Sequence, residues 1–109
     1  METPPAAVSQ LFRIGGRVDA NVAMGLRAEL MERIESGNTK LVLELSDVGF
    51  IDSTGLSVLI TALKQASAAG GEVVLANATA NVRSIIEVTG LHRVFRMFDD
   101  EQAALQAIA

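Results

Sequence analysis

The sequence predicts one α/β domain with a mostly parallel or mixed sheet of four to five strands and about four helices. Three observations predict it: a length of 109 residues, an apolar content of 50%, and a regular alternation of strand-like and helix-like segments. A chain of this length fills a single hydrophobic core. The alternation favours parallel strands that are joined by right-handed crossover helices.

The predicted strands are short apolar or alternating segments bounded by glycine, proline or polar turn residues. They cover residues 9–15, 41–45, 73–76 and 94–98. We expect Gly15-Gly16 to bend the chain after the first strand and Ser46-Asp47 to form a turn after the second. Pro4 and Pro5 make residues 1–8 an irregular initial segment or a shortened edge strand, because proline cannot join a central strand.

The predicted helices carry apolar residues every three or four positions between a capping residue and a glycine. Asp19 is a good N-cap for the first helix, which is expected to stop at Gly37. Further helices are expected from the hydroxyls after Asp52 to Gly70-Gly71, over residues 79–89, and after Asp99-Asp100.

The composition argues against several classes of function. A net charge of −4 disfavours nucleic acid and anionic membranes as partners, and the four aromatic residues, all Phe, offer no platform for stacking bases. The single histidine, His92, makes a histidine-rich metal site or a histidine relay improbable. The absence of cysteine is compatible with the cytoplasm, no apolar run is long enough to cross a membrane, and no secretory signal is visible. Another protein is therefore the expected partner.

The segment 50–56, with the sequence Phe-Ile-Asp-Ser-Thr-Gly-Leu, carries the candidate chemistry. It places the hydroxyls of Ser53 and Thr54 at a helix start, where unpaired N–H groups and the helix dipole favour an anion such as a phosphoryl group. Gly55 is expected to leave the first turn open to another protein. Asp52 either orients the Ser53 hydroxyl or caps the helix. Taken alone, the segment is explained more often by ordinary helix capping than by function.

The same segment resembles the signature of the STAS family, the sulfate transporter and anti-sigma factor antagonist domain. Other landmarks follow in the order found in that family, and the resemblance runs from about residue 9 to residue 108. These landmarks are Gly16-Arg17-Val18-Asp19, Leu41-Val42-Leu43-Glu44-Leu45, Gly70-Gly71-Glu72-Val73-Val74 and Val88-Thr89-Gly90-Leu91. The resemblance implies a single STAS-type domain over residues 1–109.

The resemblance implies an anti-sigma factor antagonist. In that family the unphosphorylated antagonist binds an anti-sigma factor serine kinase of the histidine-kinase-like ATPase type and frees the sigma factor. Phosphorylation, here expected at Ser53 with Thr54 as runner-up, releases the antagonist, and a metal-dependent serine phosphatase resets it. Nucleotide and magnesium belong to the kinase, so no cofactor or metal is expected in this chain. The residues implied to meet the partner are Asp19, Asn21, Asp52, Ser53, Thr54, Gly55 and Leu56.

Other functions fit the sequence less well than a phosphorylated antagonist. Catalysis is disfavoured because Ile51 stands where a nucleophile elbow needs glycine, and only His92 could serve as a base. Neither a P-loop nor a Gly-x-Gly-x-x-Gly run follows a strand. The stronger alternative is a non-catalytic STAS subunit of a transporter or of a stress-sensing scaffold. Asp19 likewise has two readings, as a helix cap and as part of the partner surface.

Overall fold

A four-stranded parallel sheet with helices on both faces forms the structure, a computed structural model that describes residues 10–109. The strands lie in the order β1-β2-β3-β4, and each pairs in parallel with the next. They are β1 (Gln10–Val18), β2 (Lys40–Ile51), β3 (Glu72–Ala76) and β4 (Met97–Phe98). The helices are α1 (Ala20–Glu35), α2 (Ser53–Ala68), α3 (Ala80–Val88) and α4 (Glu101–Ala107), with a 3₁₀ turn η1 (Leu91–Arg93) after α3. The predicted fold class is confirmed.

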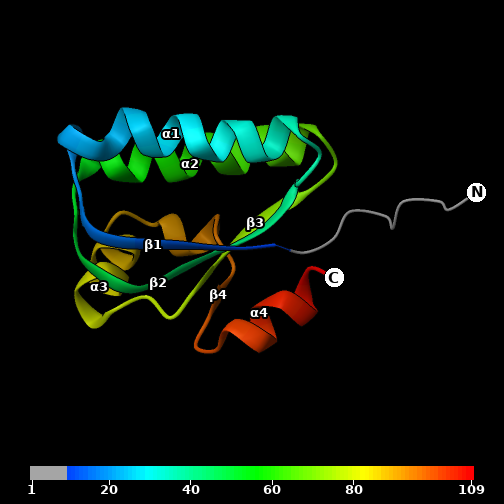
Figure 1. The fold of residues 1–109 in the computed structure, drawn as a ribbon. Coiled ribbons are helices and arrows are strands. Elements are labelled where there is room, and N and C mark those ends of the chain that lie inside the picture. The colour runs from blue at the N-terminus through cyan, green and yellow to red at the C-terminus, as the bar shows by residue number, and fades with distance from the viewer. Residues whose placement is uncertain (1–9) are drawn as a thin grey trace, which may run out of the picture.

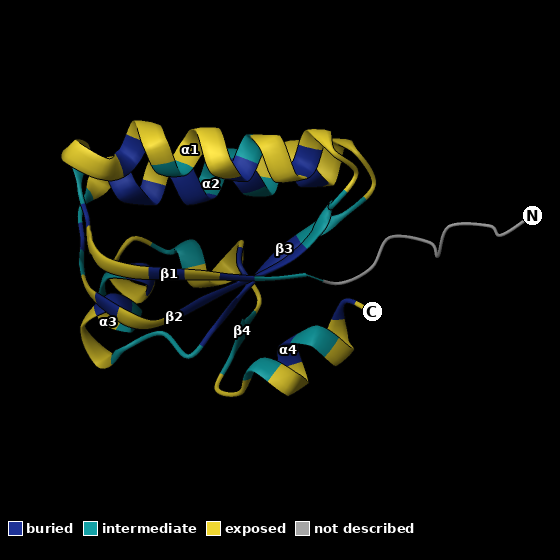
Figure 2. Cartoon of the chain, viewed as in Figure 1, coloured by how far each residue is buried: buried dark blue, intermediate teal, exposed yellow. Residues whose placement is uncertain are grey.

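The two helix pairs cover opposite faces of the sheet. Figure 1 shows α1 and α2 side by side on one face, with α3 and α4 on the other. Residues buried in α1 and α2 lie on the sides that face the sheet, and their outer sides are exposed (Figure 2). This amphipathic pattern is what the three-to-four-residue spacing of apolar positions predicts.

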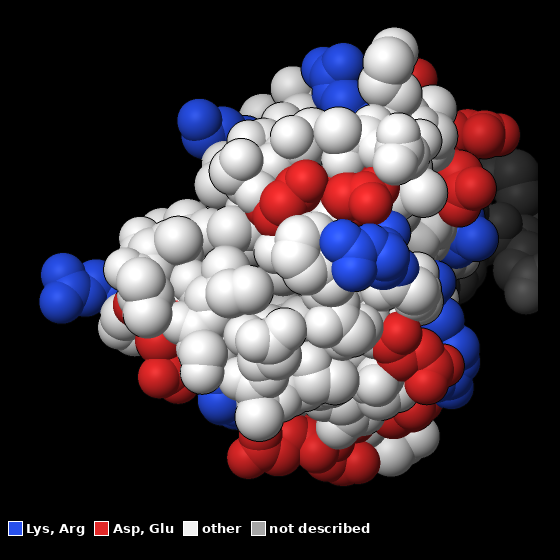
Figure 3. Space-filling view, turned by 90° about the vertical axis from the view of Figure 1, so that its left-hand side faces the viewer, with Lys and Arg blue, Asp and Glu red and all other residues white. Residues whose placement is uncertain are grey.

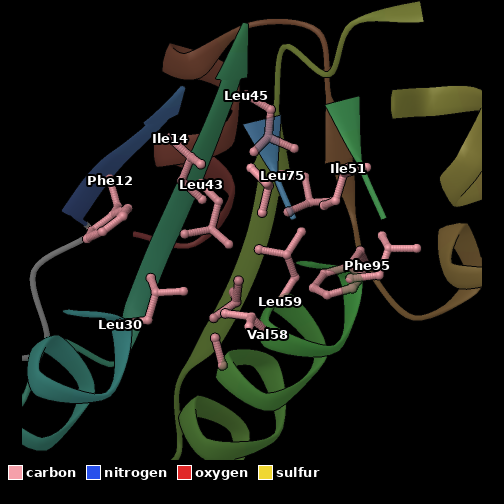
Figure 4. Packing of buried hydrophobic residues seen from close by; sticks show 14 of the residues in the cluster. Phe12, Ile14, Leu30, Leu43, Leu45, Ile51, Val58, Leu59, Leu75 and Phe95 are labelled. Carbon is pink, nitrogen blue, oxygen red and sulfur yellow. The ribbon is translucent and has the colours of Figure 1, made fainter. Parts of the chain in front are cut away.

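Apolar side chains from sheet and helices meet in two cores. In the larger core, Leu43 and Leu75 from the strands pack with Leu59 of α2 (Figure 4). Val42, one residue before Leu43, points to the other face, because successive strand residues alternate sides. There it joins a smaller core beneath α4 that also contains Val74, Ala76, Ala104 and Ile108.

The first two strands are longer than predicted. Gly15-Gly16 does not bend the chain away, because both glycines pair with β2. Ser46-Asp47 is not a turn, because both residues lie within β2 and Asp47 pairs with Gly15. The register shifts between Arg13 and Gly15 and again between Gly16 and Arg17, and at each shift β2 contributes one residue more than β1. Gly16 has a φ of +78°, a conformation that glycine adopts without strain. We call the paired segments 15–18 of β1 and 46–51 of β2 the arm; it runs beyond the last residue of β2 that pairs with β3.

The last predicted strand is mostly a turn. Gly90 ends α3 with a φ of +77°, and the chain then forms η1, so only Met97 and Phe98 pair with β3. The apolar residues that suggested a longer strand have a different use, because Phe95 packs into the larger core.

The predicted capping residues fall where expected. Asp19, Asp52 and Asp100 cap α1, α2 and α4, and Gly37 and Gly70 adopt positive φ values just after α1 and α2. The prediction for residues 1–8 lies outside the described residues. None of the helices within residues 10–109 is long and apolar enough to span a bilayer.

Candidate functional site

The arm brings the N-termini of α1 and α2 together at one end of the molecule. Val18 and Ile51 are partners at the end of the β1–β2 ladder, and the helices begin two residues later at Ala20 and Ser53. The Asp52 amide donates to the Val18 carbonyl at 3.2 Å, which ties the two strand ends together. Figure 3 looks onto this end, where acidic and basic side chains lie beside one another in a largely uncharged surface.

Asp52 caps α2 through its carboxylate. Its Oδ1 accepts a hydrogen bond from the Gly55 amide at 2.9 Å, and its carbonyl accepts from the Leu56 amide, also at 2.9 Å. This is the bonding expected of an N-cap residue. Of the two roles left open by the sequence, the structure shows capping, and the carboxylate is directed at the backbone.

Ser53 and Thr54 occupy the first two positions of α2 with exposed side chains. The Ser53 carbonyl accepts a hydrogen bond from Ser57 Oγ at 2.9 Å, whereas the Ser53 hydroxyl has no hydrogen bond within the described part of the chain. An exposed hydroxyl at the positive end of a 16-residue helix is accessible to a modifying enzyme and favourable for an added negative charge.

Gly55 and Leu56 lie beneath the hydroxyls and are buried. A Cβ on Gly55 would overlap the carbonyl oxygen of Val18 and lie 2.8 Å from Val18 Cγ1 and 2.9 Å from Ile51 Cγ1. The expectation that Gly55 leaves the first turn open to another protein is therefore wrong. Its missing side chain allows α2 to approach β1 closely, and Leu56 joins the larger core. Contact between a partner and these two residues stays a prediction.

Asp19 and Asn21 form the start of α1. Asp19 Oδ1 accepts from the Asn21 amide at 3.0 Å, so the capping role of Asp19 is confirmed, while its proposed partner contact stays a prediction. The other carboxylate oxygen, Oδ2, lies 3.6 Å from Arg17 Nε. The Asn21 side chain is exposed. Asp19 and Asn21 thus share the arm end of the molecule with Asp52 and Ser53.

A cation–π contact at the arm was not foreseen. The Arg17 guanidinium lies 4.1 Å from the centroid of the Phe50 ring. Each of these residues stands two positions before an N-cap aspartate, and the two are register partners on neighbouring strands. If the sequences of the two strand ends are aligned by Asp19 and Asp52, Arg17 and Phe50 fall at the same position, so this signal could have found the contact.

Glu44 is a buried carboxylate in β2, before the arm begins. Its exposed fraction is 3%. Burial raises its pKa, but hydrogen bonds from Asn77 and Ser46 and the nearby Arg13 outweigh burial and hold the pKa of Glu44 below its usual value. The Asn77 amide donates at 2.8 Å and the Ser46 hydroxyl at 2.9 Å, so the carboxylate is well satisfied. Its environment is that of a structural anchor between β2 and the β3–α3 loop.

The described residues offer little for other chemistry. They contain no group of three or more His, Cys, Asp or Glu side chains that could hold a metal ion. His92 is exposed in η1, and no hydrogen bond in residues 10–109 joins it to Ser53.

Comparison with known proteins identifies relatives over most of the chain. The STAS domain family matches residues 2–104. BtrV of Bordetella bronchiseptica is 33% identical over 92 residues, which cover 84% of this chain and 79% of that protein. The anti-sigma-B factor antagonist of Bacillus subtilis is 30% identical over 93 residues, covering 85% and 84%.

Solved structures share the fold at lower identity. The anti-sigma factor antagonist SpoIIAA in its unphosphorylated form matches with a TM-score of 0.78 and 21% identity, over 96% of this chain and 92% of that one. The phosphorylated form of SpoIIAA from Bacillus gives a TM-score of 0.71 at 20% identity, over 96% of both chains. The STAS domain of a SulP transporter from Vibrio cholerae gives 0.72 at 21% identity, over 96% and 83%. The family match covers nearly the whole sequence, so the chain belongs to the STAS domain family.

Proposed function

We propose that this chain is a cytoplasmic anti-sigma factor antagonist that is switched by phosphorylation at Ser53. The unphosphorylated form binds an anti-sigma factor serine kinase of the histidine-kinase-like ATPase type and thereby frees the sigma factor. Phosphorylation releases the antagonist, and a metal-dependent serine phosphatase restores it. The chain itself acts by binding and supplies no catalytic group. One observation carries the proposal: the exposed Ser53 hydroxyl at the start of α2, free of hydrogen bonds within residues 10–109.

The names of relatives support the antagonist role. The Bacillus subtilis relative at 30% identity is an anti-sigma-B factor antagonist, and RsfB of Mycobacterium tuberculosis, also 30% identical, is an anti-sigma-F factor antagonist. The two matches cover 85% and 90% of this chain. Matches of this length in a chain of 109 residues span both helix starts and Ser53.

The fold tolerates a phosphoryl group on Ser53. The helix dipole contributes about 0.3–1 kcal/mol in favour of the added anion. Repulsion from the Asp52 carboxylate, at about 5 Å with an effective dielectric constant of about 20, costs about 3 kcal/mol for each unit of charge and less where water screens it. SpoIIAA keeps this fold in both its unphosphorylated and phosphorylated forms. Because a phosphate adds nearly two charges, repulsion exceeds the dipole term by a few kcal/mol, so we expect phosphorylation to lower the free energy of unfolding without unfolding the domain.

Binding responds to the phosphate more strongly than folding does. A partner that covers Ser53 without offering a cation must remove water from a dianion, at a cost of several kcal/mol. A loss of about 4 kcal/mol weakens association roughly a thousandfold. The same modification therefore leaves the antagonist folded and releases it from its partner.

The test uses the purified anti-sigma factor kinase from the same bacterium, with ATP and magnesium. Intact-mass measurement should show one phosphate on the wild type and on Thr54→Val, and none on Ser53→Ala. Thr54→Val is the matched control because Thr54 is the neighbouring exposed hydroxyl on the same helix turn. Phosphate gained by Ser53→Ala, or lost only in Thr54→Val, contradicts the assignment to Ser53.

A transporter or scaffold subunit is the second candidate. It is supported by the fold shared with the SulP STAS domain, at 21% identity. Affinity purification with the wild type as bait separates the two functions. Recovery of an ATPase anti-sigma factor supports the antagonist, and recovery of a membrane transporter in its place overturns it.

A further inference from the structure

A groove between α1 and α2 begins beside the Ser53 position. It measures about 270 Å³ and lies between the first turns of the two helices. Thr54, next to Ser53, forms part of its wall. The other lining residues are Ala23, Met24 and Arg27 of α1, and Ser57, Val58 and Thr61 of α2.

The hydroxyl-bearing side chains of α2 leave the groove largely apolar. Ser57 Oγ donates to the Ser53 carbonyl at 2.9 Å, and Thr61 Oγ1 donates to the Ser57 carbonyl at 2.9 Å. These hydroxyls are thus engaged by their own helix and need no partner in the groove. Ala23 and Val58 are buried at 3% and 5% exposure, so they form an apolar floor.

Met24, on the α1 side of the groove, exposes an apolar side chain to water. Its exposed fraction is 84%, although methionine is a side chain that normally gains by burial. Methionine is flexible and polarizable, and it is common on surfaces that bind protein partners. The position of Met24 on the rim of a groove beside Ser53 therefore indicates a contact surface.

Arg27 supplies the charge that selects the occupant. It lines the same groove one turn after Met24, and it makes no hydrogen bond or ion pair within residues 10–109. Other arginines, such as Arg83 and Arg96, pair with carboxylates of this chain. An unpaired guanidinium beside an apolar cleft matches a partner segment that carries a carboxylate next to an apolar side chain.

We propose that this groove is a second contact surface for the anti-sigma factor that binds at Ser53. A partner segment would place an apolar side chain against Met24 and Val58 and a carboxylate against Arg27. The inference rests on the proposed function, and it adds a way in which phosphorylation of Ser53 affects binding in the groove. Thr54 in the groove wall directly follows Ser53 in the chain, so a phosphate on Ser53 would stand near the partner carboxylate that Arg27 attracts and would repel it.

The test measures affinity of the purified kinase from the same bacterium for three variants by isothermal titration. Met24→Ala and Arg27→Gln should each raise Kd about tenfold or more, as expected for anchor residues of an interface. Val88→Ala is the matched control, because Val88 is also apolar, has an exposed fraction of 87% and lies on α3. Its Kd should stay within twofold of the wild type. The exposure of Met24 predicts unchanged thermal unfolding, which separates binding from folding.

A photo-cross-linking amino acid placed at position 24, and in a parallel sample at position 88, identifies the occupant directly. A kinase adduct from position 24 and none from position 88 is the expected result. An adduct of position 24 with a second copy of this chain overturns the proposal. If the kinase binds the wild type and phosphorylates Ser53, but both groove variants keep the wild-type Kd, the groove proposal is wrong and the proposed function stands. If the kinase binds neither the wild type nor the variants, the proposed function is wrong, and the assignment of the groove to that partner is wrong as well.

Discussion

The close approach of α2 to β1 predicts that alanine has opposite effects at two helical glycines. At Gly55 a new Cβ would overlap the Val18 carbonyl oxygen and press on Val18 Cγ1 at 2.8 Å and Ile51 Cγ1 at 2.9 Å. The carbonyl is fixed backbone that also accepts the Asp52 amide. At Gly25, inside α1, a new Cβ meets nothing within 4 Å.

The expected magnitudes follow from packing and helix propensity. Overpacking costs about 1–3 kcal/mol, and we take the upper end because the Val18 carbonyl cannot rotate away as a side chain would. Alanine has a higher helix propensity than glycine, which offsets up to about 1 kcal/mol of this cost. Gly55→Ala should therefore be about 2 kcal/mol less stable than the wild type. Gly25→Ala gains about 0.5–1 kcal/mol because alanine restricts the unfolded chain and favours the helix.

Thermal and urea unfolding followed by circular dichroism measure both variants. For a domain of about this size, 2 kcal/mol corresponds to a fall in Tm of about 8–16 °C. Gly25→Ala should raise Tm by a few degrees on the same scale. A Gly55→Ala protein that is as stable as Gly25→Ala would refute the argument that Gly55 is required by the contact between α2 and β1.

Two further predictions concern the carboxylates that the structure places. Asp52→Ala should lower the free energy of unfolding by about 1 kcal/mol, because α2 loses its cap. Asp52→Asn should keep most of the wild-type stability, because asparagine also caps helices. Equal urea midpoints for Asp52→Ala and the wild type would contradict the capping role. Glu44 has a folded-state pKa below the ordinary value of a glutamate, so its ionised form stabilises the fold at neutral pH. That stability is lost as the pH falls through the ordinary glutamate pKa and then through the lower folded-state pKa. Urea midpoints of Glu44→Gln should therefore fall less between neutral and acidic pH than those of the wild type, and parallel pH profiles would show that Glu44 contributes nothing.

Capping was predictable because it is local. The residues that end one element and begin the next lie within a few positions of each other, and Asp19 and Asp52 accept amides two and three residues ahead. The same locality let the sequence place Ser53 at the positive end of a helix. The alternation of apolar spacing was likewise enough for the order of strands and helices.

The arm was not predictable in the same way because its cause is non-local. Gly15 and Ser46 are common turn residues, yet Gly15 pairs with Asp47 and β2 runs on through Ser46. The pairing of Arg17 with Phe50, and the need for a bare Cα at Gly55, depend on where β1 ends relative to α2. Reading each segment on its own does not reveal that register, which becomes visible only when the two strand ends are aligned by Asp19 and Asp52.

The shortened β4 shows a related limit. The apolar residues in 94–98 fit a strand, but Phe95 enters the larger core from the turn that follows η1. The spacing of apolar residues predicts which side chains are buried. It does not distinguish a strand from a turn that places the same side chain in the core.

The affinity of the anti-sigma factor kinase for this chain, with and without a phosphate on Ser53, is the most direct test of the switch. Both forms should be folded at the assay temperature, and the phosphorylated form should unfold at the lower temperature because its phosphate repels Asp52. The phosphorylated form should bind about a thousandfold more weakly. Equal dissociation constants for the two folded forms would contradict the claim that charge at the start of α2 governs docking.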